Sequence, residues 1–539
     1  MTDRFRATLA QLGPAPGDLA GNAAQAMTAW TAAREAGSDM LALPELFLTG
    51  PDLGDLVRDQ AFMDAVHDTV ADLAQRTSQG PALLIGAPCR ARGTLHAAYW
   101  VCQGGAITAR VLKHTVAKDG AYDHAGLFDA APIPGPVSVG PVRIGVLLGE
   151  DAHAPDVAEA QAESGAEILL APTAAPFHRG GHDRRLTHAV ARVVETGLPL
   201  IHLNGLGGDG RTTCDGTSFI LNRGGALAHQ MGFCDPGLRH VDFARDGAGW
   251  TASTGDRPPL PPQVEQEYRI LVDALTHRCH VTGAGTAIVD PTGGTDSALT
   301  AIIAVDALGP DNVHCVMMGE GGPTRPSRDA ARDLAHDLGA RIDQIALDAV
   351  AGALAEALHP LLRDHEDRTA FPARLRDLAL AALAETTGAL PLVAVNKTDM
   401  ALGAMPHGAN PGRYNPVGDV FSSRVEQLCQ WRVGTHRNWM RAPANITIPS
   451  GVFRASGPPS TEGLPPDVLD EILGHLIERD ADLADLAARG HDPDTLVRIT
   501  RLLHKVEAGT AGFPPGPRLS SRALGDRRYP AGQAWLAES

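Results

Sequence analysis

Lysine is scarce in this chain: of its 46 lysine and arginine residues, only four are lysines, namely Lys113, Lys118, Lys397 and Lys505. Basic charge is also in deficit, because 63 acidic residues give a formal net charge of −17. Such a chain does not carry the broad basic surface of a general nucleic-acid-binding protein, although a local basic pocket can still hold a small anion. Since arginine dominates elsewhere, a position that keeps lysine is a candidate for a role that needs an amine.

Paired cysteines are absent as well. The seven cysteines are widely scattered, and no two of them form a C-x-x-C pair. An odd and dispersed set is typical of reduced structural thiols and predicts neither a disulfide framework nor a zinc site. These cysteines are Cys89, Cys102, Cys214, Cys234, Cys279, Cys315 and Cys429.

Long apolar runs are missing too. No stretch approaches the length of a membrane span, and the opening MTDRFRATLAQL lacks the apolar core of a signal peptide. We therefore expect a cytoplasmic protein with no membrane anchor.

A proline-rich passage, TGDRPPLPPQ at residues 254–263, divides a chain too long for one hydrophobic core. Before it, short apolar runs alternate with helical patterns and G-G turns, which indicates a layered α/β sandwich. After it, the spacing is β-loop-α-β-α-β, as in a parallel sheet with right-handed crossovers. We predict one domain over residues 1–250, a linker over 251–263 and a second domain over 264–539 with a helical C-terminal part.

The segment DPTGGTDSAL at residues 290–299 places two glycines between the end of a strand and the start of a helix. Gly293 and Gly294 let the backbone approach an anion closely, and the helix N-terminus favours negative charge. Asp296 could hold Mg²⁺, and the hydroxyls of Thr292 and Ser297 could donate to phosphate oxygens. This is not a Walker A loop, because no lysine follows the glycines. The alternative is a tight turn whose helix is capped by Asp296 and Ser297.

In the segment RIGVLLGEDAH, residues 143–153, an apolar strand ends at Gly149 and two acids follow, Glu150 and Asp151. Hydrolases present their nucleophile at strand-to-loop corners of this kind. Glycine provides neither a thiol nor a hydroxyl. The sequence therefore predicts a corner without a nucleophile.

A series of motifs makes the chain similar to glutamine-dependent NAD+ synthetases over about residues 5–530. The resemblance implies a nitrilase-like α-β-β-α sandwich domain that hydrolyses glutamine, followed by a parallel-sheet α/β domain of the ATP-pyrophosphatase type. The second domain would use ATP and Mg²⁺ to adenylate nicotinate adenine dinucleotide and then amidate it to NAD+. Homo-oligomers through the nitrilase-like domain are also implied. The motifs are LALPELFLTG, VLKH, GEDAH, HAVARVVETGLPLIHLN, TGGTDSAL, RYNPVGD and DRRYP.

In the N-terminal half, the resemblance assigns Glu45 as the general base of glutamine hydrolysis and Lys113 as the group that stabilises the oxyanion. The family's cysteine falls on Gly149. We therefore expect Glu45 and Lys113 to persist as a buried ion pair in an inactive glutaminase pocket. Cys214 lies in a different segment and is a weak candidate for a replacement thiol.

In the C-terminal half, T-G-G-x-D-S resembles the S-G-G-x-D-S loop of ATP pyrophosphatases, which cleave ATP to AMP and pyrophosphate. The resemblance assigns Asp296 and Asp399 to the metal, with Asp399 in place of a longer glutamate. It assigns ATP and pyrophosphate binding to Thr292, Gly293, Gly294, Asp296, Ser297, Arg374 and Lys397.

Several other positions depart from the family pattern. Thr369 and Pro372 stand where E-N-x-Q is usual, and Gly418 and Gly509 are neutral where basic residues are common. Arginine-for-lysine drift does not explain a glycine, and a site for ATP and a dinucleotide needs fixed cations.

Three functions follow from these observations. The first is a ligase that amidates nicotinate adenine dinucleotide, or a related carboxylate, with ammonia that its own glutaminase half does not make. The second is a catalytically inactive nucleotide-binding or regulatory paralogue. The third is an intact glutamine-dependent synthetase, with which Gly149 conflicts.

Overall fold

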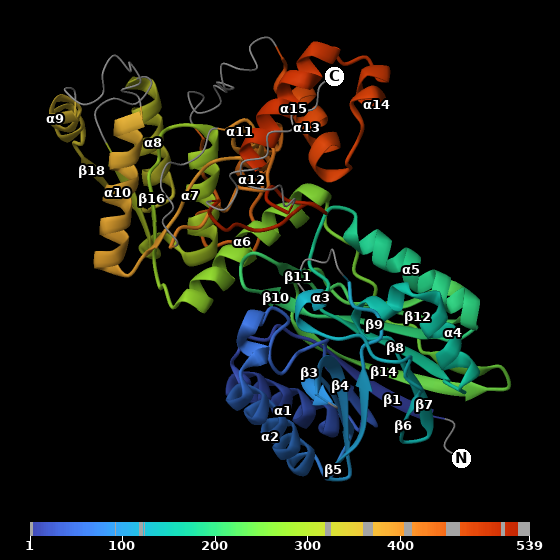
Figure 1. The fold of residues 1–539 in the computed structure, drawn as a ribbon. Coiled ribbons are helices and arrows are strands. Elements are labelled where there is room, and N and C mark those ends of the chain that lie inside the picture. The colour runs from blue at the N-terminus through green and yellow to red at the C-terminus, as the bar shows by residue number, and fades with distance from the viewer. Residues whose placement is uncertain are drawn as a thin grey trace. The chain divides into compact units, whose positions relative to one another are not determined.

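The chain divides into two compact units, Met1–Pro262 and Gln263–Ser539 (Figure 1). Within the part of the chain that is described, no helix is long and apolar enough to cross a membrane. The computed structural model describes residues 4–91, 93–117, 122, 124–318, 325–358, 370–403, 412–448, 464–507 and 513–526.

The first sheet of unit 1 has seven strands in the order β15-β14-β1-β2-β3-β4-β5. The pairs β1–β2 and β2–β3 are parallel, and the other neighbours are antiparallel. Helices α1 (Leu19–Glu35) and α2 (Gln60–Arg76) pack their buried sides on one face. The strands are β1 (Arg4–Gln11), β2 (Met40–Ala42), β3 (Ala82–Ala91), β4 (Thr94–Gln103), β5 (Ala106–Leu112), β14 (Gly237–Asp246) and β15 (Gly249–Ala252).

The second sheet of unit 1 has six strands in the order β13-β12-β9-β8-β7-β6, with β7, β8 and β9 parallel. Helices α4 (Pro155–Glu163) and α5 (Gly181–Thr196) cover its outer face. The strands are β6 (Val137–Val139), β7 (Val142–Val146), β8 (Ile168–Thr173), β9 (Leu200–Asn204), β12 (Phe219–Leu221) and β13 (Leu227–Gln230). The remaining short elements are α3 (His124–Leu127), β10 (Leu206–Gly208), β11 (Thr213–Asp215) and the 3-10 turns η1 (Gly54–Arg58), η2 (Gly149–His153) and η3 (Arg223–Gly225).

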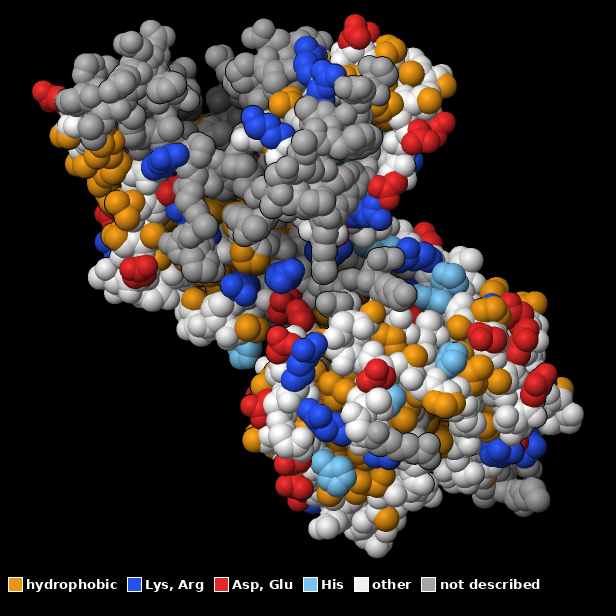
Figure 2. Space-filling model, in the orientation of Figure 1, with side chains coloured by type: hydrophobic (Ala, Val, Ile, Leu, Met, Phe, Trp, Pro, Cys, Tyr) orange, Lys and Arg blue, Asp and Glu red, His pale blue; other side chains and the backbone are white. Residues whose placement is uncertain are grey.

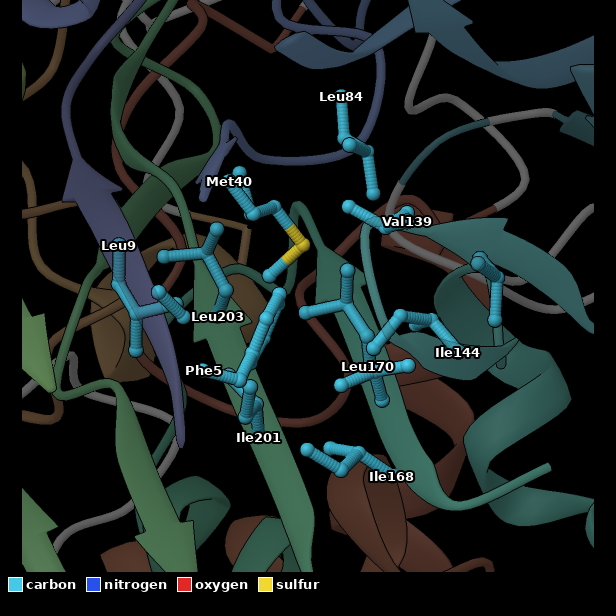
Figure 3. Close-up of a cluster of buried hydrophobic side chains, with 14 of the residues drawn as sticks. Phe5, Leu9, Met40, Leu84, Val139, Ile144, Ile168, Leu170, Ile201 and Leu203 are labelled. Carbon is cyan, nitrogen blue, oxygen red and sulfur yellow. The ribbon is translucent and has the colours of Figure 1, made fainter. Parts of the chain in front are cut away.

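The core of unit 1 lies between these two sheets (Figure 3). Phe5 and Met40 from the first sheet face Ile168 and Leu170 from the second. On β8 the alternate residue Leu169 belongs instead to the cluster under α4 and α5. Side chains alternate along a strand, so a parallel strand covered on both faces needs a continuous apolar run, as in ILLAPT. The predicted α-β-β-α sandwich is confirmed.

Unit 2 contains a parallel sheet of four strands in the order β18-β17-β16-β19. The strands are β16 (Ala287–Val289), β17 (Val313–Met318), β18 (Arg341–Ile345) and β19 (Leu390–Pro391). The helices along this part are α6 (Gln263–Thr282), α7 (Thr295–Leu308), α8 (Arg325–Asp337), α9 (Asp348–Leu358) and α10 (Ala370–Thr387), with the 3-10 turn η4 (Pro310–Asn312). The predicted parallel α/β fold of the second half is confirmed.

The apolar run PLVAVN, residues 391–396, has the composition of a strand but is paired over little of its length. Strand β19 pairs with β16 at Leu390, which precedes the run, and at Pro391, after which Leu392 forms an isolated bridge to Tyr414. The chain then turns into Asn396, which begins a helix as its N-cap. The run is apolar enough for a strand, but the helix start that follows ends the pairing.

The C-terminal part of unit 2 is helical, as predicted. It contains α11 (Lys397–Ala401), α12 (Ser422–Val433), α13 (Pro466–Glu478), α14 (Leu483–Ala488) and α15 (Pro493–Glu507). A separate apolar cluster joins α13, α14 and α15. Arg432 on α12 binds both carboxylate oxygens of Asp306 on α7, and the Tyr268 hydroxyl of α6 donates to the same carboxylate. This fully buried group ties three helices together.

On the face of the molecule in Figure 2, the described acidic and basic side chains are interspersed among apolar ones. The basic side chains visible there do not gather into one large patch.

Candidate functional site

The corner after β7 in unit 1 is built on Gly149. Residues 144–148, from the end of strand β7 to Leu148, are buried, and the 3-10 turn η2 starts at Gly149. Gly149 has φ +58°, in the left-handed region that glycine adopts without a steric penalty. The strand therefore delivers residue 149 to a sharp turn inside the protein.

Glu45 and Lys113 meet beside this corner, as the sequence predicts. Lys113 Nζ lies 2.7 Å from Glu45 Oε1 and also forms an ion pair with Glu150. The second oxygen of Glu45 accepts a hydrogen bond of 3.3 Å from the backbone N–H of Ala174. Glu45 and Lys113 are only 4% and 1% exposed, so each depends on the other for compensation of its charge.

The missing side chain of Gly149 would point into this ion pair. A Cβ added at residue 149 would lie 2.5 Å from Lys113 Nζ and 2.6 and 2.7 Å from the two carboxylate oxygens of Glu45. The Cβ direction of residue 149 therefore faces the Glu45–Lys113 ion pair. The space that its side chain would need is occupied by the charged groups themselves.

Lys113 keeps its proton in this surrounding. Burial acts to lower the pKa of its amine, but Glu45 and Glu150 together outweigh burial and raise that pKa. In the same way, Lys113 overcomes the effect of burial on Glu150 and lowers the pKa of that carboxyl. The buried Lys113 thus lies between the carboxylates of Glu45 and Glu150. We call these three residues the ion triad.

A metal ion does not fit this pocket. Ligand atoms of Glu45, His124 and Glu150 lie within 4.8 Å of one another. However, the ammonium of Lys113 already contacts both carboxylates, so a divalent cation would face a like charge. The ring Nε2 of His124 also lies 3.2 Å from the carbonyl of Pro51.

Sequence reasoning missed the aromatic wall of this pocket. His124 stacks on Tyr122 with ring centroids 5.3 Å apart and packs edge-on against Phe128. Burial lowers the pKa of His124, with a further contribution from the Lys113 charge. The signal was the Y-D-H segment at residues 122–124, which follows Lys113 in a chain with only 4% aromatic residues.

Cys214 lies nearer to this pocket than its place in the sequence indicates. It packs in a small cluster with Tyr122 and Ala174, and its Sγ is 3.6 Å from the Tyr122 hydroxyl. Burial raises the pKa of the Cys214 thiol to about 12. A neutral buried thiol is a poor nucleophile, which argues against its replacing the cysteine.

In unit 2, β16 is connected to α7 by the start of the segment DPTGGTDSAL, which we call the phosphate loop after its predicted role. Gly293 has φ +83°, and Gly294 is the N-cap of α7 without a side chain to cap it. Thr292 Oγ1 donates to Ser297 Oγ at 3.1 Å, and Ser297 Oγ donates to the carbonyl of Gly294 at 2.9 Å. The two hydroxyls thus lie together at the start of the helix. Asp296 occupies its first turn.

The carboxylates of Asp296 and Asp399 lie on either side of one amide. Asn396 Nδ2 is 2.8 Å from Asp296 Oδ2 and 3.1 Å from Asp399 Oδ2. Burial, followed by the charge of Asp399, raises the pKa of Asp296 to about 7. Two carboxylates beside a phosphate loop are the kind of donor set by which Mg²⁺ is bound, so the residues present fit this ion.

The two predicted basic residues of the ATP site have different surroundings. Arg374 is exposed on α10. Lys397 is fully buried, with its Nζ 2.7 Å from Asp419 Oδ1, 2.8 Å from Glu478 Oε1 and 3.0 Å from Ser520 Oγ. These contacts give the Lys397 amine a structural role, while phosphate binding by Arg374 and Lys397 stays a prediction.

The remaining departures from the family pattern lie only partly in the described structure. Thr369, Gly509 and the side chain of Pro372 fall outside the described residues. At Gly418, an added Cβ would lie 2.9 Å from Asn415 Nδ2, so a larger residue would require that side chain to move.

The two halves match two protein families. The carbon-nitrogen hydrolase family matches residues 6–248, and the NAD synthase family matches residues 267–508. The chain is 42% identical to a glutamine-dependent NAD(+) synthetase of Rhodobacter capsulatus, with 100% of each chain covered. It is 30% identical to such a synthetase of Xylella fastidiosa (strain Temecula1 / ATCC 700964), covering 99% of this chain and 100% of that one.

The fold is also shared with solved structures. A glutamine-dependent NAD+ synthetase from Acinetobacter baumannii, solved in complex with adenosine diphosphate, has a TM-score of 0.76. The match covers 99% of this chain and 100% of that one at 24% sequence identity. With full-length identity of 42% to one relative and both family matches in the same order, the chain belongs to the glutamine-dependent NAD+ synthetase family.

Proposed function

We propose that this protein is a carbon–nitrogen ligase that takes its nitrogen from ammonia it does not make. In the proposed reaction, a carboxylate attacks the α-phosphorus of ATP, which forms an acyl-adenylate and releases pyrophosphate. Ammonia then attacks the acyl carbon, AMP leaves, and an amide is formed. The acceptor is nicotinate adenine dinucleotide or a related acid.

The observation that carries this proposal is the geometry at Gly149. Glutamine hydrolysis of this kind requires a nucleophile at the corner, and glycine supplies none. The adjoining ion triad fills the position of the missing side chain and commits the Lys113 ammonium to two carboxylates. Cys214 is the thiol considered as a replacement nucleophile, and burial raises its pKa, which keeps it in the unreactive neutral form.

The ATP half of the proposal rests on the phosphate loop. The backbone around Gly293 and the N-terminus of α7 are suited to hold pyrophosphate, and the hydroxyls of Thr292 and Ser297 lie at the same point. Asp296 and Asp399 would hold Mg²⁺. When bound, the cation would offset phosphate charge.

A single assay tests the proposal. The full-length protein is incubated with ATP, Mg²⁺ and nicotinate adenine dinucleotide, with either ammonium or glutamine, while AMP, pyrophosphate and NAD+ are measured. We expect turnover with ammonium and none with glutamine in ammonia-free buffer. The Asp296→Ala variant should lose turnover with ammonium. Asp311 is an exposed acid of the same unit, and Asp311→Ala should keep this turnover.

Two other functions remain as outcomes of this assay. The names of the relatives favour an intact glutamine-dependent enzyme, and NAD+ formed from glutamine alone would establish it. The burial of Lys397 among protein partners favours a regulatory paralogue. That function would be supported by measurable ATP binding without AMP formation from any carboxylate.

We further propose, from the family resemblance, that the protein assembles into homo-oligomers through unit 1. Sedimentation of the full chain should then give a mass at least twice that of the 56.4 kDa monomer.

A further inference from the structure

Asn396 joins the two carboxylates of the candidate metal site. Its side-chain nitrogen donates to Asp296 Oδ2 at 2.8 Å and to Asp399 Oδ2 at 3.1 Å. Its backbone N–H adds a bond of 3.3 Å to Asp296 Oδ2. Because Asn396 is only 3% exposed, this arrangement is largely shielded from water.

The orientation of the Asn396 amide is defined by its other end. Asn396 Oδ1 accepts a hydrogen bond of 2.9 Å from the backbone N–H of Asp399 and thereby caps α11. The oxygen is thus paired with a donor and the nitrogen with two acceptors. A flipped amide would lose all three bonds, so the NH₂ group faces the carboxylates.

Two buried carboxylates that face one point repel each other. An amide NH₂ offers one hydrogen to each of them but carries no formal charge. A divalent cation would use the same carboxylate oxygens and supply the charge that the amide lacks. The amide therefore does part of what a cation would do, because it binds both carboxylates and draws them toward one point.

We propose that Asn396 is a positioning residue that holds Asp296 and Asp399 on one point when no cation is bound. Mg²⁺ then takes over the carboxylate oxygens when it binds. The inference rests on the proposed metal site and adds a role for a side chain that is not itself a ligand, because its oxygen is committed to capping α11.

Matched variants separate this role from helix capping. Asn396→Ser keeps a side chain that caps a helix N-terminus and removes the bridging NH₂ group. Asn396→Ala removes both functions. The exposed Asp311→Ala serves as the control within the same unit.

The test is thermal unfolding of the full-length variants in EDTA and in saturating Mg²⁺. We expect Asn396→Ser to lower the Tm in EDTA by about 2–4 °C, and we expect Mg²⁺ to remove most of this difference. In EPR titrations with Mn²⁺ alone, Asn396→Ser should bind the metal at least as tightly as the wild type.

Three outcomes would overturn the proposal. The first is an Asn396→Ser protein with the wild-type Tm in EDTA, which would leave capping as the whole role of Asn396. The second is weaker Mn²⁺ binding with an unchanged Tm, which would make Asn396 a direct ligand. The third is a wild-type protein that does not respond to Mg²⁺ at all. The AMP assay above is independent and reports separately on the proposed function.

Discussion

Residue 149 lies at a sharp corner with a left-handed backbone, which is also the kind of turn on which hydrolases carry a nucleophile. It lies beside Glu45 and Lys113, where the resemblance places a nucleophile. Its backbone φ of +58° is one that residues other than glycine rarely adopt. In the described structure, the ion triad has closed over the space that a side chain would occupy. A side chain at residue 149 would therefore require the ends of the Glu45 and Lys113 side chains to move.

Restoring the thiol should accordingly restore little activity. We expect Gly149→Cys to cost about 1–3 kcal/mol of unfolding free energy, because of its left-handed φ and its overlap with the ion triad. We expect it to release little ammonia from glutamine. Urea denaturation and a coupled glutaminase assay measure the two effects.

Gly149→Ala is the matched control for this prediction. It has the same backbone strain and a Cβ but no thiol, so its loss of stability should be similar. Rapid glutamine hydrolysis by Gly149→Cys would show that the rest of the pocket is intact and that the ion triad yields to a side chain.

At the scale of elements, Lys397 links α11 to α13 and to the segment 513–526. Its amine contacts Asp419, Glu478 on α13 and Ser520, and Asp419 in turn accepts from the backbone N–H of Leu519 and Ser520. Removing one partner of a buried ion pair leaves the others unpaired. The helix that carries Asp399 thus depends on a lysine that begins it.

Replacing this lysine distinguishes a structural role from phosphate binding. We expect Lys397→Met to lower the unfolding free energy by about 3–5 kcal/mol, because Asp419 and Glu478 lose their counter-charge. Urea denaturation measures this loss, and calorimetric titration measures ATP affinity. The exposed Lys505→Met is the control. Unchanged stability with weakened ATP binding would restore the predicted phosphate role.

Some strands could be predicted from the sequence more accurately than others. The strand ILLAPT was predictable because a strand buried on both faces reads as a continuous apolar run. The run PLVAVN at residues 391–396 is equally apolar, yet only its first residue, Pro391, pairs with β16, because Asn396 soon starts a helix. Local pattern gives the preference for extended chain, and the available partner strand decides how far it extends.

At the scale of the whole molecule, unit 1 contains buried histidines that resist protonation. His202 is 4% exposed and stacks on Phe219, and burial, with the charge of Arg185, holds its pKa well below the ordinary value. Partial burial also lowers the pKa of His182. The buried imidazole of His202 is therefore held in its neutral form.

This feature predicts acid sensitivity of unit 1. When the pH falls below about 6.5, the unfolded chain binds protons that folded His202 does not, so folding stability decreases. For one such histidine, the free energy of unfolding falls by up to about 1.4 kcal/mol for each pH unit below this value. Above pH 6.5 this contribution to stability is fully present.

Hydrogen exchange of peptides covering β9 checks this prediction at pH 7.5 and pH 5.5, after correction for intrinsic exchange. We expect protection to fall in acid for the wild type and to fall less for His202→Gln. His436→Gln, an exposed histidine in unit 2, should behave like the wild type. Equal protection at both pH values would contradict it.

The sequence by itself determined the chemistry that each half can offer. A glycine at 149 supplies no nucleophile in any fold, and the glycines and hydroxyls of TGGTDS suit an anion. These conclusions depend on residue identity and on neighbours within a few positions, which the sequence displays directly.

Tertiary structure alone decided which charges neutralise each other. Lys113 pairs with Glu45 across 68 positions of the sequence, which places this lysine at the Gly149 corner. Lys397 pairs with Glu478 across 81 positions, which gives this second lysine a structural role. Asn396 meets Asp296 across 100 positions. Electrostatic interactions depend on distance and burial, and in a folded chain neither follows from separation along the sequence.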